Sequence, residues 1–442
     1  MSGRARRLIP VLALRDLVVV AAASMGPAFS LATTMGAMIG AAARWTWLAL
    51  LAVAVLMAMI ASGYKRLGER IRDAGSSYAW VRVAFGGVAG AYAAWVLLVA
   101  NMFAVLATAL PAATYTLDLF APAHADDPRA TAYLACLWIV AAALLLWYGL
   151  RPTALLAAAL LLAELVVLAG AAAASALHPR AGAVAFTATP PDGGAFVAAI
   201  VLGVWMIDGW EVSASTAEEA RGPASAPGTG GLAGLLLTSA VMIVAIAAFD
   251  RVGSARGFAA HPDDALAYVG GLLGGSWTPL LGATVLVSLA ASLQTTLVYL
   301  TRSVYAMGRD GVLPRVLGEL DHRAEPAAAI ALIAALSLAL TLATAFSPSA
   351  RDGFGLALRG TSWFLGVLFV LSAGAGVRLF ARDRSARWTG AVVPGAAATI
   401  LAAVLLLSLR GDDLSTRGFI IVAAIIGLPL AAWRGRYARR AV

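Results

Sequence analysis

Long apolar stretches separated by short polar segments recur along the whole chain. Each stretch holds roughly 17 to 25 residues or more, enough for a helix to cross about 30 Å of hydrocarbon. We therefore expect an all-α integral membrane protein. The pattern predicts twelve transmembrane helices, at approximately 17–43, 46–62, 84–113, 130–149, 153–176, 195–217, 231–250, 278–303, 326–346, 355–378, 389–409 and 418–433.

The composition supports a membrane protein. Hydrophobic residues make up 61% of the chain, charged residues only 12%, and the mean hydropathy is +0.87, whereas about a quarter of the residues of a soluble domain are charged. The longest polar segments, 178–194 and 251–277, are the size of loops. The second contains HPDDALAYVGGLL, which predicts a short lid helix after Pro262. We expect one transmembrane domain over residues 1–442.

The distribution of basic residues predicts the orientation. Twelve crossings place both termini on one side, and 23 of the 32 Lys and Arg fall on that side. This bias favours cytoplasmic termini in the cell membrane, with anionic lipid headgroups as neighbours. A soluble basic face is missing, so no nucleic acid partner is expected. We expect Glu218 and Glu219 to pair with Arg221 or with the basic loops.

Two acids lie inside the sixth apolar stretch, in the sequence VWMIDGWEVSAS. Acids at mid-membrane are costly, so Asp208 and Glu211 mark a functional site by default. The alternative is a capping box, in which Asp208 is the N-cap and Glu211 reaches back to it. A cap in this position still requires the sixth helix to stop and restart.

The first apolar stretch contains a second interruption, Gly26-Pro27 in ASMGPAFS. Proline ends one helix and suits the first turn of the next, although a simple kink is the alternative. Interruptions in helices one and six are typical of transporters with inverted repeats. The pairing predicts a five-plus-five inverted repeat, formed by 1–176 and 195–380, with two additional helices at 389–433.

Two interrupted helices offer complementary chemistry. Half-helix N-termini after Gly26 and after Asp208 would present N–H groups to an anionic group. Carbonyl groups would be presented to a cationic group, from Ser24, Met25, Met206 and Ile207. A zwitterion suits both.

Three sequence blocks carry a resemblance to a known family. They are WMIDGWEVSASTAEEARGP, RDAGSSYAWVRVAFG (72–86) and TRSVYAMGRDGVLPRVLGELDHRAEP (301–326). Together they resemble the amino acid/polyamine/organocation (APC) superfamily, amino acid permease branch, over most of the first ten helices. The resemblance implies a LeuT-like fold with discontinuous helices one and six. It also implies a secondary active transporter that moves an amino acid or related amine by alternating access.

The resemblance places a central site between helices one, three, six, eight and ten. Trp205 matches an aromatic position that stacks on or gates the substrate, while packing is the alternative. Asn101 and Gln294 are expected to line the site or to join helices. The substrate-binding candidates are Ser24, Met25, Gly26, Pro27, Ala28, Phe29, Ser30, Asn101, Trp205, Met206, Ile207, Asp208, Gly209 and Gln294.

The chain departs from its relatives in two places. Many relatives carry Gly-x-Gly where this chain has Gly26-Pro27-Ala28, and some proton-coupled relatives use a lysine in helix five. The only lysine here is Lys65, placed in a cytoplasmic loop, and helix five carries Glu164 instead.

The coupling ion is expected to be a proton, carried by Glu211 or, as the alternative, by Glu164. Asp208 is expected to favour cationic substrates such as basic amino acids or polyamines. Sodium coupling through hydroxyls of helix eight is the competitor, and an amino acid/polyamine exchanger is a further alternative. Those hydroxyls belong to Ser288, Ser292, Thr295 and Thr296.

Other classes fit the sequence less well. A channel would need rings of polar residues, and the polar residues here are isolated. A membrane-embedded enzyme would need a catalytic cluster, but all four histidines (124, 178, 261 and 322) fall in loops. We expect no enzyme activity, no cofactor and no metal.

Overall fold

The structure is a computed structural model that describes residues 7–125, 127–180, 183, 191–347, 349–411 and 414–438. Within these residues the only extended pairing is a parallel bridge between Leu12 and Ala220. Everything else that is regular is helical. The α-helices are α1 (Leu14–Met25), α2 (Pro27–Ala42), α3 (Thr46–Arg70), α4 (Ser77–Phe85), α5 (Gly87–Phe120), α6 (Pro128–Tyr148), α7 (Leu150–Leu177), α8 (Gly193–Met206), α9 (Val212–Ser215), α10 (Ala226–Phe249), α11 (Ala255–Ala260), α12 (Ala265–Leu273), α13 (Trp277–Arg309), α14 (Ala327–Ala343), α15 (Ala350–Phe380), α16 (Val393–Gly411) and α17 (Leu414–Ala438).

Short helices of other types join or extend these elements. The 3-10 helices are η1 (Ala43–Trp45), η2 (Pro122–His124), η3 (Ala217–Glu219), η4 (Arg315–Gly318) and η5 (Thr344–Phe346), and η6 (Trp388–Val392) is a π-helix. η6 runs directly into α16, so the eleventh predicted helix starts with a wide turn.

The described residues confirm an all-α membrane protein. Ten of their helical stretches are long and apolar enough to cross a membrane. The longest, Leu14–Arg70, contains the first two predicted helices, and Gly193–Met206 is a shorter apolar helix. One predicted boundary was wrong: Lys65 lies inside α3, not in a loop, because the helix continues for two turns beyond the apolar stretch.

The polar segment 251–277 contains a short helix after Pro262, as predicted, which is α12. Asp264 accepts a hydrogen bond from the N–H of Ala267 at 3.0 Å and so caps α12. Both α11 and α12 pack against α2. The other long polar segment, 178–194, falls mostly outside the described residues.

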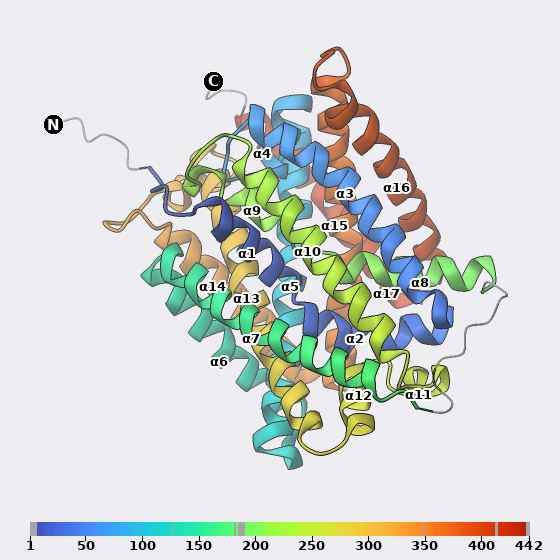
Figure 1. Cartoon of the computed structure of the whole chain (residues 1–442). Helices are drawn as coiled ribbons and strands as arrows, with labels where there is room; N and C mark the ends of the chain where they lie inside the picture. The colour runs from blue at the N-terminus through green and yellow to red at the C-terminus, as the bar shows by residue number, and fades with distance from the viewer. Residues whose placement is uncertain are drawn as a thin grey trace.

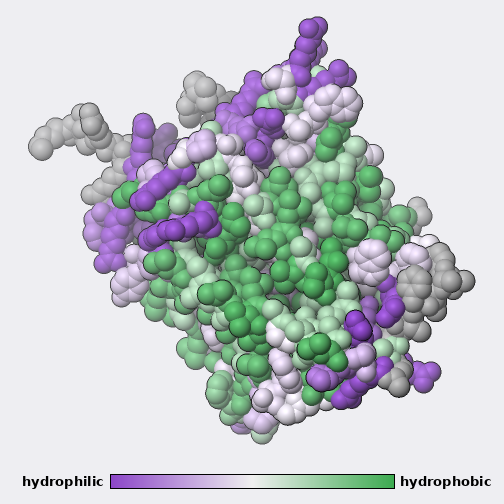
Figure 2. All heavy atoms as spheres, viewed as in Figure 1, coloured by the Kyte–Doolittle hydropathy of each residue, from purple (hydrophilic) through white to green (hydrophobic). Residues whose placement is uncertain are grey.

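The surface has a hydrophobic band between two hydrophilic regions. Figure 2 shows hydrophobic residues across the middle of the visible face, with hydrophilic residues gathered at the top and upper left and again at the lower right. Such a band is what a lipid-facing surface requires. It agrees with the apolar helices found along the chain.

Two helices are interrupted, and their four halves form two pairs. Half-helix α1 lies against α9, and α2 lies against α8 (Figure 1). The α1–α9 pair leads to the face where residues 7–13 contact 219–221, which we call the N-terminal face. The α2–α8 pair leads to the opposite face, where α11 and α12 lie.

Ion pairs join the elements at the N-terminal face. Arg302 of α13 is fully buried and binds Glu219 at 2.9 Å and Glu325 at 2.7 Å. Glu325 also accepts a hydrogen bond from the N–H of Leu150, the first residue of α7. A single buried guanidinium therefore ties η3, the segment before α14 and the start of α7 together.

A second group of ion pairs lies closer to the surface. Arg309 binds Glu218 and Asp73, each at 2.8 Å. Of the two predicted alternatives, Arg221 is not the partner of Glu218; the partner is Arg309, which is the last residue of α13 and not part of a loop. Arg221 instead donates to the carbonyl oxygen of Pro10.

Candidate functional site

The first interruption is a one-residue break. Helix α1 ends at Met25, Gly26 adopts a left-handed conformation with φ of 53°, and α2 starts at Pro27. The prediction that this helix breaks, instead of only kinking, is confirmed. The carbonyl oxygen of Met25 accepts a hydrogen bond from Ser30 Oγ at 2.8 Å.

Helix α13 satisfies further backbone groups of this break. Ser292 Oγ donates to the carbonyl oxygens of Ala23 and Ser24, at 3.1 and 3.2 Å. Ser288 Oγ accepts from the N–H of Phe29 at 3.2 Å. Because an unpaired buried backbone group is costly, these hydroxyls stabilise the break where it is.

The second interruption covers residues 207–211, between the end of α8 and the start of α9. The N–H of Gly209 donates to Glu211 Oε2 at 3.1 Å. Asp208 does not act as the N-cap that a capping box requires, because Glu211 precedes α9 and no backbone group donates to Asp208 Oδ1. The break exists, but its cause is not this cap.

The two breaks touch each other. Gly209 has φ of 100°, and a Cβ atom built there would lie 2.8 Å from the carbonyl oxygen of Ser24. Only glycine allows so close an approach in this conformation. The two interruptions therefore lie side by side, as their pairing predicted.

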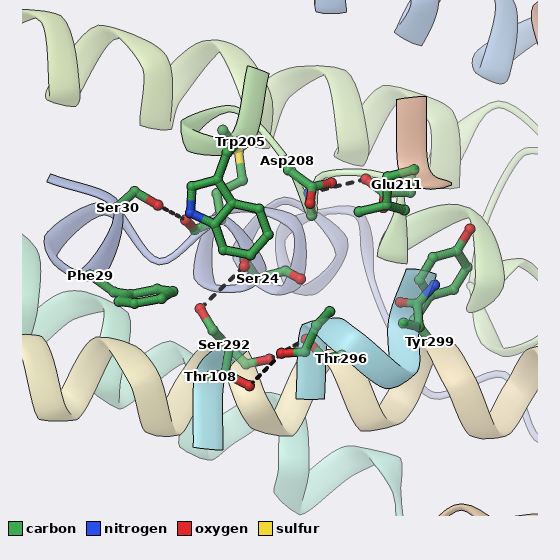
Figure 3. Close-up of a pocket in the computed structure, with 15 residues that line it drawn as sticks. Ser24, Phe29, Ser30, Thr108, Trp205, Asp208, Glu211, Ser292, Thr296 and Tyr299 are labelled. Atoms are coloured by element: carbon green, nitrogen blue, oxygen red, sulfur yellow. Dashed lines mark hydrogen bonds between the residues drawn. The ribbon is translucent and has the colours of Figure 1, made fainter. Parts of the chain in front are cut away.

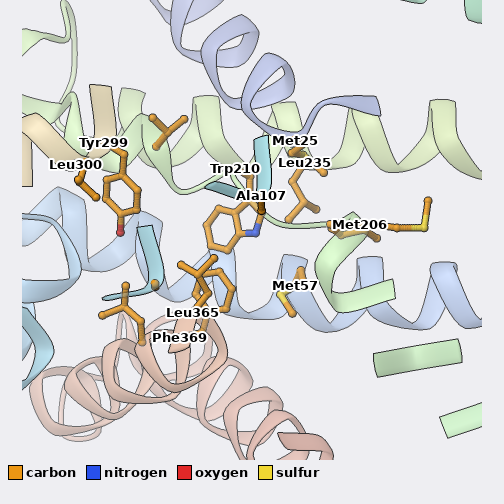
Figure 4. Close-up of a cluster of buried hydrophobic side chains, with 14 of the residues drawn as sticks. Met25, Met57, Ala107, Met206, Trp210, Leu235, Tyr299, Leu300, Leu365 and Phe369 are labelled. Atoms are coloured by element: carbon orange, nitrogen blue, oxygen red, sulfur yellow. The ribbon is translucent and has the colours of Figure 1, made fainter. Parts of the chain in front are cut away.

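Aromatic side chains of α3 and α15 pack against the second break. Trp210 stacks on Phe369 of α15, with ring centroids 5.5 Å apart. Tyr64 of α3 packs edge-on against Trp210, with ring centroids 4.9 Å apart. Figure 4 shows Trp210, Phe369 and Leu365 together in the hydrophobic core, with Met206 beside the same break. This packing positions the backbone that carries Asp208 and Glu211.

A cavity of about 40 Å³ lies where the breaks meet α5, α13 and α15. These correspond to predicted helices one, three, six, eight and ten. The cavity, which we call the central cavity, exceeds the roughly 10–15 Å³ that one water molecule needs. Its lining residues are Ser24, Met25, Phe29, Ser30, Asn101, Ala104, Thr108, Trp205, Asp208, Gly209, Glu211, Ser292, Thr296, Tyr299 and Leu365 (Figure 3).

The central cavity contains several hydrogen-bond acceptors, and it also contains two lining groups that can donate and have no partner among the described residues, the hydroxyl of Tyr299 and the indole N–H of Trp205. Asp208 Oδ1 is buried and has no hydrogen-bond partner among the described residues. Asn101 uses its amide N–H to bond the carbonyl of Leu97, so its amide oxygen remains available as an acceptor. Thr296 donates to the carbonyl of Ser292. A cationic group would complement the acceptors of this lining, above all Asp208 Oδ1.

An aromatic pair forms another part of the wall. Trp205 and Phe29 meet edge-to-face, with centroids 6.4 Å apart and an interplanar angle of 87°. In Figure 3 the indole nitrogen of Trp205 lies on the side away from Asp208, so the six-membered ring is nearer to the acid. An aliphatic or cationic substrate could pack on this ring.

The structure does not bring every predicted site residue to the cavity. Three of them, Gly26, Pro27 and Ala28, lie at the first break but do not line the central cavity. Two others, Met206 and Ile207, are buried in the hydrophobic core. Gln294 faces away and donates to the carbonyl of Ala142 in α6 at 3.1 Å. That contact is the helix-joining role given above as the alternative.

Glu164 lies behind the first break, outside the central cavity. Its side chain is 1% exposed and faces Ser288 and the backbone N–H of Ala28. Neither carboxylate oxygen has a regular hydrogen bond within the described part of the chain. The first turn of α2 therefore directs its N–H groups to Ser288 and Glu164, not into the cavity.

Sequence reasoning missed several lining residues, above all Thr108 and Tyr299. A signal was present, since Ser292, Thr296 and Tyr299 are spaced i, i+4 and i+7 and therefore share one face of α13. Asn101, Ala104 and Thr108, spaced i, i+3 and i+7, likewise share one face of α5. Leu365 offered no signal, because one leucine in an apolar helix is indistinguishable from its neighbours.

Sequence comparisons show which known proteins the chain is similar to. Residues 12–430 match the model of the family described as "Amino acid permease". Cadaverine/lysine antiporters of Escherichia coli, from strains K12 and O157:H7, are each 26% identical to the chain over 356 residues. Each match covers 76% of this chain and 76% of the relative.

Proposed function

Because this chain belongs to the amino acid permease family, we propose that the central cavity is the substrate site of a transporter for cationic amino acids and related amines. The chain is a transporter, not an enzyme, and it is a multi-pass membrane protein. The observation that carries the choice of a cationic substrate is Asp208 Oδ1 on the cavity wall, which is buried and has no hydrogen-bond partner in the part of the chain that the structure describes. An ammonium group would supply the missing donor.

The cavity is small for such a substrate, which supports a transport cycle that opens and closes it. At about 40 Å³ it holds only a few water-sized particles. In this proposal the ion pairs of the buried Arg302 with Glu219 and Glu325 are the contacts that hold the N-terminal face closed. Alternating access then requires α1 and α9 to separate from their neighbours.

The proposed membrane topology follows from the same elements. We propose twelve crossings, with α1–α2 as the first and α8–α9 as the sixth. The touching breaks support a five-plus-five inverted repeat over 1–176 and 195–380, followed by two further helices. The excess of Lys and Arg at the N-terminal face supports cytoplasmic termini.

Two coupling modes are open to this site. A proton-linked mechanism is favoured by Glu211, which is 2% exposed and shares the cavity with Asp208. Exchange is favoured by the relatives, which are named as antiporters of cadaverine and lysine. Sodium coupling is the competitor: Ser292, Thr295 and Thr296 donate their hydroxyl hydrogens to backbone carbonyls, which leaves their oxygen lone pairs able to bind any cation and does not favour sodium over a proton.

The role of Asp208 is tested by uptake of lysine, cadaverine and leucine into proteoliposomes. We expect Asp208→Asn to reduce uptake of lysine and cadaverine about ten- to hundred-fold, because a hydrogen bond to a charged group contributes about 1.5–3 kcal/mol. Leucine uptake should change much less. Asp208→Ala should behave in the same way.

A matched control is Asp192→Asn, which changes the acid that caps the start of the same helix. It should affect all three substrates alike and only weakly. Equal losses of cationic and neutral substrates in the Asp208 variants would mean that the residue only supports the backbone of the break. The substrate proposal would then fail.

A further inference from the structure

A groove on the surface of the protein follows the contact between α3 and α10. The two helices pack side by side (Figure 1), and the face over them is mostly hydrophobic in Figure 2. The groove has a volume of about 500 Å³ and is lined mainly by aliphatic side chains. We call it the α3–α10 groove, and its lining includes Leu51, Val55 and Ala58 of α3 and Leu236, Ala240 and Ile243 of α10.

A polar pocket of about 440 Å³ lies at one end of the same two helices. We call it the arginine pocket, because Arg44, Arg180 and Arg251 line it together with Asp250 and Trp47. Helix α3 starts and α10 ends beside this pocket. The pocket therefore lies at the face opposite the N-terminal face.

The pocket and the groove share the same faces of both helices. On α3, Trp47 of the pocket precedes Leu51 of the groove by four residues, and on α10, Ala247 of the pocket follows Ile243 of the groove by the same spacing. Residues four apart lie one above the other on one face of a helix. The polar pocket thus leads directly into the apolar groove.

The dimensions of the groove suit an acyl chain. From Leu51 to Ser62 the groove is about 16 Å long, at about 1.5 Å per residue, which is roughly half of the ~30 Å hydrocarbon core of a bilayer. It therefore spans one leaflet. The exposed Trp47 stands at its polar end, where tryptophans of membrane proteins meet the lipid headgroups.

The three guanidinium groups make the pocket favourable for a phosphate. Arg180 donates one N–H to the carbonyl oxygen of Leu272, which occupies one of the five donors of a guanidinium. Arg44 acts on Asp250 through its charge, and Arg251 is exposed at the rim. Guanidinium groups bind phosphate through paired N–H donors, and several of them around one pocket strengthen this preference.

The acid in the pocket adds a second requirement. Asp250 is 3% exposed, and its Oδ1 has no hydrogen-bond partner among the described residues. A buried carboxylate oxygen is stabilised by a donor, best by one that carries a positive charge. Among phospholipid headgroups, ethanolamine provides N–H donors on an ammonium group next to the phosphate. Choline has no N–H, and glycerol has no positive charge.

We propose that the arginine pocket and the α3–α10 groove together bind one phospholipid with an ethanolamine headgroup. The phosphate binds the guanidinium groups, the ammonium binds Asp250, and one acyl chain fills the groove. The lipid comes from the leaflet at the face opposite the N-terminal face. This site lies outside the central cavity and is independent of the substrate that the protein transports.

The test is lipid binding to the purified, delipidated protein, measured by native mass spectrometry and by thermal unfolding. Phosphatidylethanolamine, phosphatidylcholine and phosphatidylglycerol with identical acyl chains are compared. Phosphatidylethanolamine should bind about ten-fold or more tightly than phosphatidylcholine, because only its ammonium can donate to Asp250. It should also raise the unfolding temperature most. Equal binding of the three lipids, or tightest binding of phosphatidylglycerol, would overturn the proposal.

Three variants test the headgroup contacts. Asp250→Asn should remove the preference for phosphatidylethanolamine and leave phosphatidylcholine unchanged. Arg251→Gln should weaken binding of all three lipids about ten-fold, because each of them carries the phosphate. Arg256→Gln is the matched control, since it removes an exposed charge of α11 at the same face, outside the pocket. Equal losses in Arg251→Gln and Arg256→Gln would mean that lipids respond only to the surface charge, and the proposal would fail.

The role of the groove is tested by free phosphoethanolamine, which has the headgroup but no acyl chain. It should bind at least about a hundred-fold more weakly than the lipid, because it buries no CH₂ groups. Ala240→Trp, which fills the groove, should weaken the lipid and leave free phosphoethanolamine unchanged. Leu51→Ser removes an exposed apolar side chain of the groove and should act in the same direction. Free phosphoethanolamine that binds as tightly as the lipid would identify a site for a soluble phosphate and refute the lipid site.

Discussion

At the scale of single residues, Glu211 has the properties that a proton carrier requires. It is 2% exposed, lines the central cavity and accepts a hydrogen bond from the N–H of Gly209. It also shares the cavity with Asp208, so the two carboxylates disfavour each other's charge. Binding or release of a proton at Glu211 is therefore coupled to the charge of whatever occupies the cavity.

We predict that an imposed pH gradient, without sodium, drives substrate uptake into proteoliposomes and that Glu211→Gln abolishes this response. Exchange of internal for external substrate should survive in the variant, because glutamine keeps the size of the side chain and an acceptor for Gly209. Glu164→Gln is the matched comparison. A pH response that persists in Glu211→Gln but vanishes in Glu164→Gln would mean that Glu164 carries the proton. Uptake that depends on sodium and not on the pH gradient would exclude proton coupling.

At the scale of elements, the contact between the two breaks depends on Gly209. We predict that Gly209→Ala lowers transport at least ten-fold and destabilises the protein, because the added Cβ meets the backbone of Ser24 at 2.8 Å. Gly222→Ala is the matched control, since Gly222 also has positive φ, 89°, but open space around it. Gly222→Ala should lower the free energy of unfolding by only about 1–2 kcal/mol, which is the cost of a positive φ for a residue with a Cβ atom. Thermal unfolding and uptake of both variants measure the difference, and equal effects would mean that the contact between the breaks is unimportant.

At the scale of the whole molecule, the buried Arg302 of α13 is joined at the N-terminal face to η3, to the segment before α14 and, through Glu325, to the start of α7. We predict that Arg302→Gln lowers the free energy of unfolding by about 3–5 kcal/mol, because it leaves Glu219 and Glu325 buried without their partner. Arg309→Gln should cost clearly less, since the Arg309 side chain is 33% exposed and its ion pairs are partly solvated. Unfolding of both variants in the same detergent provides the comparison. Equal losses would show that burial does not decide the strength of these pairs.

The positions of the helices and of their interruptions could be predicted from the sequence, because each depends on residues that are close together in the chain. A long apolar stretch has to be a helix in a membrane, whatever surrounds it, and Gly26-Pro27 interrupts a helix through its own backbone. The predicted boundaries failed mainly where charged residues continue a helix. The sequence KRLGER extends α3 to Arg70, and helical propensity allows this outside the hydrocarbon.

The sequence by itself determined that this is an all-helical membrane protein with paired interruptions, and it placed the acids Asp208 and Glu211 at the second of them. Only the tertiary structure decided which side chains face one another. Asn101 and Gln294 are both amides in apolar helices, yet Asn101 lines the central cavity and Gln294 binds α6. The reason is that the facing of a helix depends on the packing of all its neighbours, which includes segments more than a hundred residues away. The same packing left Asp208 Oδ1 buried without a hydrogen-bond partner among the described residues.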